Sequence, residues 1–237
     1  IDPLFLDDLK DELNAIKGFK QKSTVEQKAK QFQTKLASLT FFDPACGSGN
    51  FLTETYISLR RLENEAIKLY MGDSVRLDVE ELDLVKVKLN QFYGIEINDF
   101  AVSVAKTALW IAESQMLEAT KEIVYAEIDF LPLKSYTNIV NANALTTDWE
   151  EVVDKDKLSY IIGNPPFLGA RVMSKAQKVD LLNVFDGYKG AGNLDFVSGW
   201  YIKSAQLMQG TEIQTALVST NSITQGEQAS LLWKILI

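Results

Sequence analysis

The sequence predicts an α/β fold in which a doubly wound, mostly parallel sheet follows an N-terminal helical segment. First, apolar runs of strand length alternate with longer stretches of helical periodicity, which is typical of strand–helix–strand units. Second, the earliest of these runs, LTFF, leads through a glycine-rich turn directly into a helical stretch. Third, 237 residues with 46% hydrophobic and 24% charged side chains are enough for one large globular domain.

Residues 1–38 are predicted to form two helices ahead of the sheet. Apolar side chains recur at intervals of three and four between residues 6 and 16, which is the spacing of one helix face. Ser23 and Glu26 match the capping-box pattern, which places the start of the second helix near Ser23. We therefore divide the chain into a helical segment, 1–38, and a domain, 39–237, that contains the whole sheet.

The domain is predicted to alternate strands and helices. The predicted strands are LTFF (39–42), VKVKL (85–89), QFYGIEI (91–97), NIVNANAL (138–145), KLSYIIG (157–163) and EIQTALVST (212–220). The predicted helices are 50–70, 98–117 and 193–208. Asn98 or Asp99 is expected to cap the second of these helices. An irregular region surrounds Pro132, and three glycines indicate a loop over 171–192.

The residue types exclude several kinds of chemistry. With no His and a single Cys, the chain cannot form a Ser-His-Asp triad, a disulfide or a four-ligand Cys/His zinc site, and we assign no metal. No apolar run approaches the roughly 20 residues that cross a bilayer, and the acidic N-terminus lacks the features of a signal peptide. These features favour a cytoplasmic protein with no membrane partner. Because the chain begins at Ile1 rather than Met, we expect it to be a piece of a longer protein.

The glycine-rich turn and the strand that ends near Glu96 indicate a ligand site. Ligands of open parallel sheets bind beyond the carboxyl ends of the strands, and Gly47 and Gly49 allow a close approach of the backbone. The turn is neither G-x-G-x-x-G nor a P-loop, which favours a nucleoside or amino-acid ligand over a pyrophosphate. Glu96 could accept two ribose hydroxyls, although it lies about 50 residues beyond the turn rather than about 20, which predicts an insertion near 70–90. A tight turn with a surface Glu is the alternative, and Cys46 is interpreted as a small packing residue.

Several motifs then follow one another in the order found in one family of enzymes. DPACGSGNFL (43–52) and GIEIND (94–99) come first, NANAL (141–145) follows, and GNPPF (163–167) precedes NLDFVSGWYI and ALVSTNSITQGEQ. Over about residues 39–230 this order resembles the gamma class of N6-adenine DNA methyltransferases, most of all the single-chain type II restriction–modification enzymes with fused endonuclease and methyltransferase. NANAL departs from the family pattern, because it lacks the Asp often found in the adenine-binding motif.

The resemblance implies a Rossmann-like fold of the S-adenosylmethionine-dependent methyltransferase type and methyl transfer to N6 of a flipped adenine in duplex DNA. It also implies that 39–237 is the methyltransferase catalytic domain, truncated before the target recognition domain that makes the main contact with double-stranded DNA in a prokaryotic cytoplasm. The residues that it implies for catalysis are Asn164, Pro165, Pro166 and Phe167. The residues that it implies for cofactor binding are Asp43, Pro44, Ala45, Gly47, Gly49, Asn50, Phe51, Glu96, Ile97, Asn143, Ala144, Asn164 and Asp195, with Phe196 beside Asp195.

Within that set the resemblance implies distinct roles. Asp43 would lie close to the cofactor's amino group, while Glu96 would hold the ribose and Ile97 would flank the adenine ring. Asn143 and Ala144 would edge the same ring.

The chemistry of residues 164–167 supports this interpretation. The exocyclic amine of adenine is a poor nucleophile, because its lone pair is delocalised into the ring. Two acceptors aimed at its hydrogens, the Asn164 side-chain oxygen and the Pro165 carbonyl, would favour a tetrahedral nitrogen and free the lone pair. The prolines hold that carbonyl rigidly, and Phe167 offers a face for an extruded base. A strand end closed by a rigid turn is the structural alternative.

Two other functions stay open. Methyltransferases for glutamine side chains or RNA use similar motifs, although they usually have DLGCGSG or DLGTGSG at the first motif, and a catalytically inactive domain could bind a partner. The net charge of −8 argues against a nucleic-acid-binding module, so we expect the basic surface to belong to the recognition domain. Residues 171–192 form either a DNA-facing loop or a solvated one, and their cationic side chains are Arg171, Lys175, Lys178 and Lys189.

Overall fold

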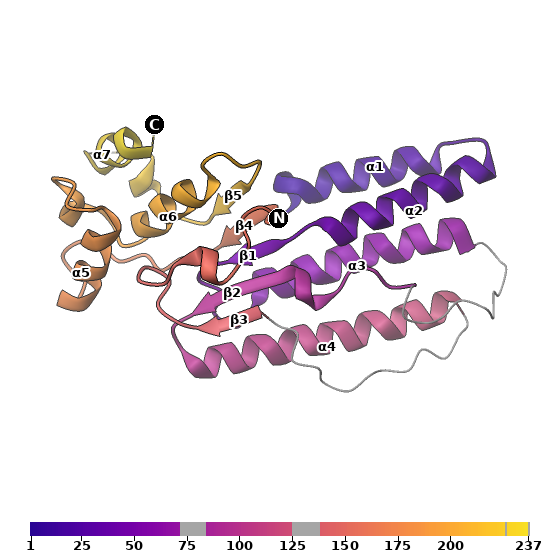
Figure 1. Ribbon diagram of the computed structural model, residues 1–237, viewed down its shortest axis with the longest axis horizontal. Helices are drawn as coiled ribbons and strands as arrows, with labels where there is room; N and C mark the ends of the chain where they lie inside the picture. The colour runs from indigo at the N-terminus through magenta and orange to yellow at the C-terminus, as the bar shows by residue number, and fades with distance from the viewer. Residues whose placement is uncertain (72–83, 125–137, 226, 237) are drawn as a thin grey trace.

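The computed structural model describes residues 1–71, 84–124, 138–225 and 227–236 (Figure 1). Within these ranges five strands form one parallel sheet in the order β3-β2-β1-β4-β5. The strands are β1 (Phe41–Asp43), β2 (Phe92–Glu96), β3 (Asn138–Asn141), β4 (Tyr160–Gly163) and β5 (Gln214–Leu217). The predicted doubly wound parallel sheet is confirmed. Its strand order reverses between β1 and β4, the position at which such sheets bind ligands.

Helices precede, connect and follow the strands. The α-helices of the described ranges are α1 (Asp7–Lys17), α2 (Lys22–Ser38), α3 (Asn50–Met71), α4 (Asp99–Val124), α5 (Lys175–Val184), α6 (Ser198–Met208) and α7 (Glu227–Leu236). A π-helical turn, Asp2–Leu6, leads into α1, and single 3-10 turns lie at Leu89–Gln91, Trp149–Glu151, Ala191–Asn193 and Asn221–Ile223. Among the helices that the structure describes, none is both long enough and apolar enough to cross a membrane.

Two apolar cores cover the two faces of the sheet. Neighbouring residues of a strand point to opposite faces, so Phe41 enters the core beneath α1–α4 while Phe42 enters the core beside α6. On the first face Phe41 stacks on Phe92 with ring centroids 5.4 Å apart. Here α1 to α4 run side by side as a helical array (Figure 1). On the second face Trp149 meets Phe42 edge to face at 5.2 Å. Because both faces are covered, the strand ends are the part of the sheet available for a site.

The predicted strand 85–89 is wrong, since this stretch is irregular up to the 3-10 turn Leu89–Gln91. Glu63, a fully buried residue of α3, accepts hydrogen bonds from the backbone N–H groups of Lys86 at 2.6 Å and Val87 at 3.2 Å. A side chain therefore takes the donors that a strand would give to its neighbour. The alternation in VKVKL reflects the burial of Val87 against the helical array.

The predicted loop 171–192 is also wrong, because it contains α5. Ser174 Oγ accepts from the N–H of Gln177 at 3.2 Å, and Gln177 Oε1 accepts from the N–H of Ser174 at 2.9 Å. These reciprocal bonds form a capping box, which is a start signal that the sequence displayed. The glycines that suggested a loop lie after the helix, and Gly187 and Gly190 both have positive φ.

Two predicted helix starts need correction. α2 begins at Lys22 with Gln21 as its N-cap, so Ser23 lies inside the helix rather than capping it. α6 begins at Ser198 instead of residue 193, because the chain first turns around the carboxylate of Asp195.

One predicted cap is confirmed by its hydrogen bond. Asn98 Oδ1 accepts from the N–H of Ala101 at 3.2 Å, which fixes the start of α4 directly after β2. The predicted insertion near 70–90 falls largely on residues 72–83, which lie outside the described residues. The irregular region around Pro132 lies outside them entirely.

Candidate active site

The carboxyl ends of β1 and β4 lie side by side, which brings the glycine turn next to residues 164–167. A Cβ atom placed on Gly163 would stand 2.6 Å from Oδ1 of Asp43 and 3.3 Å from its Cγ. There is therefore no room for a side chain on the last residue of β4, and Asn164 is the next residue along the chain. Both motifs could be found in the sequence, but the contact between them could not.

The glycine turn is held by its own backbone and by neighbouring elements. The Cys46 N–H donates to the Ile95 carbonyl at 3.1 Å, and the Gly49 N–H donates to the Cys46 carbonyl at 2.7 Å. From the other side, the Trp200 indole N–H donates to the Pro44 carbonyl at 3.0 Å. Trp200 belongs to α6, far along the chain, and no local pattern pointed to it. The turn thus has a fixed shape.

The two turn glycines serve different purposes. Gly47 has φ +52°, and no atom lies within 4 Å of the position that a Cβ would occupy, so its surroundings are open. Gly49 has φ +83°, and its Cβ would stand 2.9 Å from Cβ of Ala105 in α4. Gly47 therefore leaves room for a ligand, whereas Gly49 is required by the packing of the turn against a helix. Beyond the turn, Asn50 is exposed and Phe51 is half-buried at the start of α3.

Cys46 is buried and packs against β2. Its Sγ would lie 3.0 Å from a Cβ on Gly94, so the thiol fills the space above that glycine. Burial raises the pKa of the Cys46 thiol, with the charges of Asp43 and Glu96 acting in the same direction. The interpretation of Cys46 as a packing residue is confirmed, since a buried thiol with a raised pKa is not a nucleophile.

Glu96 joins the end of β2 to the glycine turn. Its Oε2 accepts from the Gly47 N–H at 2.9 Å, and its Oε1 accepts from the Asn98 N–H at 2.9 Å. A carboxylate oxygen can accept more than one hydrogen bond, so Oε1 and Oε2 of Glu96 can each still accept a hydrogen bond from a hydroxyl group. Ile97, the next residue, is 69% exposed. Asn141 supports this strand end, because its Nδ2 donates to the Glu96 and Ile97 carbonyls, both at 3.0 Å.

Asn143 and Ala144 lie just beyond β3. Asn143 Oδ1 accepts from the Leu145 N–H at 3.0 Å, and its Nδ2 donates to Oδ2 of Asp180 at 2.8 Å. Ala144 is buried, and its carbonyl accepts from the Trp149 indole at 2.8 Å. The Asn143 side chain therefore links the end of β3 to α5. Asp180 was not predicted from the sequence, because residues 171–192 were expected to form a loop rather than to contain α5.

Residues 164–167 project from the sheet with little cover. Asn164 and Pro166 are exposed, Pro165 is buried, and Phe167 is 38% exposed. In the described part of the chain no residue makes a hydrogen bond with the Asn164 side chain. The segment is tied to the sheet at its start, where the Val218 N–H donates to the Gly163 carbonyl at 2.9 Å. Within the described ranges, the Asn164 amide therefore has no hydrogen-bond partner, and it is followed two prolines later by a partly exposed aromatic ring.

Asp195 and Phe196 contact Leu168, the residue that follows the Asn164–Phe167 segment. Asp195 is 8% exposed, and its Oδ1 accepts from the N–H of Leu168 at 3.1 Å. The Phe196 N–H donates to the Leu168 carbonyl at 2.9 Å. The Phe196 ring is buried edge to face against Trp200, with centroids 5.3 Å apart. Both residues therefore contact the chain just after Phe167.

Asp43 is the buried charge of the site. Its side chain accepts from the Ala45 N–H at 2.9 Å and is 1% exposed. Burial raises the pKa of this carboxyl to about 7, the Ala45 hydrogen bond opposes the shift, and the charge of Glu96 adds to it. The Asp43 carboxyl therefore takes up a proton at a higher pH than an exposed Asp would.

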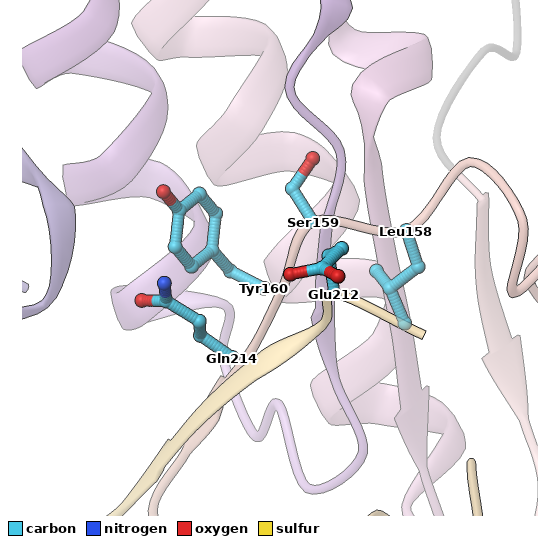
Figure 2. A pocket seen from close by; sticks show the side chains of 5 residues that line it. All are labelled: Leu158, Ser159, Tyr160, Glu212 and Gln214. Atoms are coloured by element: carbon cyan, nitrogen blue, oxygen red, sulfur yellow. The ribbon is translucent and has the colours of Figure 1, made fainter. Parts of the chain in front are cut away.

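A small pocket lies at the other edge of the sheet (Figure 2). It has a volume of about 170 Å³ and is lined by Leu158, Ser159, Tyr160, Glu212 and Gln214. Tyr160 and Gln214 are the first residues of β4 and β5, whereas Gly163 and Asp43 are the last residues of their strands. The pocket is thus at the amino edge. The predicted site residues gather at the carboxyl edge, toward which the arrows of β2 and β3 point, on the side of α5 (Figure 1).

A parallel sheet that reverses its order beside a glycine turn, with an acidic residue at the end of the next strand, is typical of a Rossmann-like methyltransferase domain. The sequence supports the same class at the level of a family. Residues 19–237 match the family described as MmeI, DNA-methyltransferase domain, and the chain belongs to that family.

Individual relatives agree with this assignment. The chain is 43% identical over 98% of its length to DNA methyltransferase A of Bacillus subtilis (strain 168), of which it covers 26%. It is similar to the structure of the Type IIL restriction-modification enzyme MmeI in complex with DNA, with a TM-score of 0.90 and 44% identity over 99% of this chain and 31% of that one. The Type ISP enzyme LlaGI, solved as a nuclease-deletion mutant with a DNA substrate mimic, shares the fold at a TM-score of 0.52 and 16% identity, over 83% of this chain and 17% of its own. The chain thus spans less than a third of the length of each of these relatives.

Proposed function

We propose that this chain is the catalytic domain of a restriction–modification enzyme and transfers a methyl group from S-adenosylmethionine to N6 of an adenine flipped out of duplex DNA. The observation that carries the proposal is the position of Asn164. Its amide has no hydrogen-bond partner among the described residues, and it follows Gly163, the strand end that lies against the Asp43 carboxyl where the strand order reverses. Family membership and the DNA-bound relatives support DNA as the substrate.

The residues at the strand ends fit the proposed cofactor. The open space at Gly47 leaves room for the methionine part, and the Glu96 carboxylate can accept ribose hydroxyls beside it. Ile97 exposes an apolar side chain suited to the face of an adenine ring. Because Ala144 is buried, we propose that it packs below the adenine ring rather than contacting the edge of the ring. Asp43 remains predicted to lie near the amino group, and its carboxyl shapes the turn through Ala45.

The two acceptors of residues 164–167 would act on the exocyclic amine. Asn164 Oδ1 would accept one of its hydrogens and the Pro165 carbonyl the other, which directs the nitrogen lone pair away from the ring plane. The fixed φ of the prolines and the burial of Pro165 keep the second acceptor in place. When bound, the cofactor would supply an electrophilic sulfonium methyl group, and its sulfur would be left as a neutral thioether once the nitrogen had taken the methyl. The methylated amine would release its extra proton to solvent at the exposed Asn164, so no histidine is required.

Phe167 would receive the extruded base. Its ring is 38% exposed next to Asn164, so a flipped adenine could stack on it while its amine reaches the two acceptors. Stacking of a base on an aromatic side chain contributes about 1–3 kcal/mol, which offsets part of the energy of unpairing.

The contact with the duplex is proposed to lie mostly outside this chain. A net charge of −8 does not suit a surface that neutralises phosphates. The cations of residues 171–192 are the exception, and two of them, Lys175 and Lys178, lie on the first turns of α5. Because α5 follows the proposed base site along the chain, it is the element of this domain that we propose to face the DNA.

The experiment that tests this function is transfer of a labelled methyl group from S-adenosylmethionine by the full-length protein. Duplex DNA, RNA and a release-factor protein compete as acceptors, and the labelled product is digested and identified. We expect label in N6-methyladenine from DNA. Label in RNA or in protein glutamine would overturn the choice of substrate. Cofactor binding without any transfer would favour an inactive domain.

A further inference from the structure

We infer that Asp195 is a positioning residue, which acts by fixing the end of the Asn-Pro-Pro-Phe segment rather than by binding the cofactor. The inference rests on the proposed function, because it assigns a role in placing Asn164 and Phe167. The family resemblance predicts that Asp195 borders both the cofactor and the target pocket, whereas the inference assigns it to the target side alone, from the contacts that its carboxylate makes.

The Asp195 carboxylate bonds to two backbone segments at once. Its Oδ1 accepts from the Leu168 N–H at 3.1 Å and from the Val197 N–H at 3.1 Å. The side chain is 8% exposed, so these charge-assisted bonds lie away from bulk water. One carboxylate oxygen therefore joins the residue after Phe167 to the start of α6.

Leu168 is held through both of its backbone groups. Its N–H donates to Asp195, and its carbonyl accepts from the Phe196 N–H at 2.9 Å. Pro165 and Pro166 have no N–H, so neither residue can be held by a backbone donor of its own. The Asn-Pro-Pro-Phe segment is held at its two ends, by Gly163 in the sheet and by Leu168 at Asp195 and Phe196. Without the Asp195 carboxylate the Leu168 N–H would lose its acceptor, and the bond from the Phe196 N–H would remain.

The other contacts of this region explain why a shift at Leu168 would matter. The Asp195 carbonyl accepts from the Ser198 hydroxyl at 2.6 Å, which secures the first turn of α6. Further along α6, Trp200 donates to the Pro44 carbonyl in the glycine turn. The start of α6 thus contacts both halves of the site, and Asp195 is its link to the half that would hold the base. Displacement of reacting groups by about 1 Å can lower turnover about 100-fold.

The test compares Asp195→Ala and Asp195→Asn in the full-length protein. In Asp195→Ala we expect kcat to fall about 100-fold, with the dissociation constant of S-adenosylmethionine within about 3-fold of the parent. Asp195→Asn keeps an acceptor oxygen for Leu168 and Val197, so its kcat should stay within about 5-fold of the parent. A duplex with 2-aminopurine at the target position reports how the flipped base is held. Its fluorescence should change in Asp195→Ala and not in Asp195→Asn.

Asp154→Ala is the matched control, because Asp154 also accepts a backbone N–H, that of Asp156 at 3.1 Å, but lies on the approach to the amino end of β4. It should leave kcat and the fluorescence unchanged. A parallel loss of cofactor affinity and turnover in Asp195→Ala would overturn the inference in favour of a cofactor ligand. An Asp195→Asn variant that folds but is as inactive as Asp195→Ala would also overturn it. If the parent protein methylates no DNA, the proposed function has failed instead.

Discussion

The two halves of the candidate site differ in how they are held. On the cofactor side, the glycine turn is bonded to β2, to α6 and to the Glu96 carboxylate, and Asp43 is buried beneath it. On the base side, Asn164 and Phe167 are exposed, and the segment is anchored only at its ends. The backbone of the cofactor side is thus fixed by hydrogen bonds within the protein. On the base side, the Asn164 side chain makes no hydrogen bond with the described residues, and the Phe167 ring is partly exposed.

This difference corresponds to the two ligands that we propose. A small cofactor of fixed shape is bound best by a surface that needs no reorganisation, which favours backbone groups already locked by hydrogen bonds. A base that swings out of a duplex must enter from solvent, so its acceptors have to stay open until it arrives. Substitutions on the base side should therefore affect rate, whereas substitutions on the cofactor side should affect binding.

The largest effect is expected for Asn164→Ala. Removal of one of the two acceptors should lower kcat for methyl transfer about 1,000-fold, because the lone pair of the amine is no longer freed. The dissociation constant of S-adenosylmethionine, measured by calorimetry, should stay within about 3-fold of the parent. Asn14→Ala, at an exposed position of α1, is the control and should retain full rate. If cofactor affinity fell together with rate, the separation of the two halves would be wrong.

The next effect concerns stability and belongs to the cofactor side. The folded-state pKa of Asp43 is raised to about 7 from an ordinary value of 3.8, so the folded protein binds an extra proton between these values. Folding stability should therefore fall as pH rises from about 4 to about 7, by roughly 4 kcal/mol in all. Asp43→Asn removes this titration and should unfold at a higher urea concentration than the parent at pH 8.

Asp11→Asn, an exposed carboxylate on α1, serves as the control and should follow the parent at every pH. Cofactor binding should weaken in Asp43→Asn even as stability rises, because the carboxyl is maintained for the ligand rather than for the fold. A pH dependence that survives in Asp43→Asn would assign the titration to another group.

The sequence was sufficient for the parts of the fold that depend on local patterns. The five strands of the sheet, the cap at Asn98 and the glycine turn follow from periodicity and turn chemistry. Helix α5 is an exception, because its capping box was visible in the sequence but the glycines that follow it suggested a loop. Where a side chain from elsewhere determines the backbone, the prediction failed. VKVKL alternates like a strand, but Glu63 captures its N–H groups.

The candidate site shows the same division. Motif residues such as Asn164 and Glu96 could be singled out because their types are unusual at strand ends. The contacts between these residues could not be predicted, because each joins distant parts of the chain. They are the close approach of Gly163 to Asp43, the hydrogen bond from Trp200 to Pro44 and the hydrogen bond from Leu168 to Asp195. These contacts depend on the packing of α6 and the sheet, which no window of sequence contains.

Gly163→Ala tests the boundary between the halves. A Cβ there would stand 2.6 Å from Asp43 Oδ1, so the carboxyl or the strand end must move. Because both halves are displaced, we expect about a 100-fold loss in kcat/KM, shared between weaker cofactor binding and slower transfer. Gly169→Ala is the matched control, since nothing lies within 4 Å of its Cβ position. Steady-state kinetics with varied cofactor separate the two contributions, and an effect on only one of them would contradict the shared contact.

The smallest effect is expected for Glu96→Gln. The amide keeps one acceptor oxygen but replaces the other with a donor, which faces the N–H of Gly47 or Asn98. One backbone bond and one acceptor for the ribose hydroxyls are lost, so the dissociation constant of S-adenosylmethionine should rise about 10-fold. At saturating cofactor kcat should match the parent, because the base side is untouched. Glu150→Gln, an exposed carboxylate bonded to Lys155, should leave both quantities unchanged. A fall in kcat at saturating cofactor would show that the glycine turn also positions the reacting groups. The separation into a base side that affects rate and a cofactor side that affects binding would then hold for Asn164 alone.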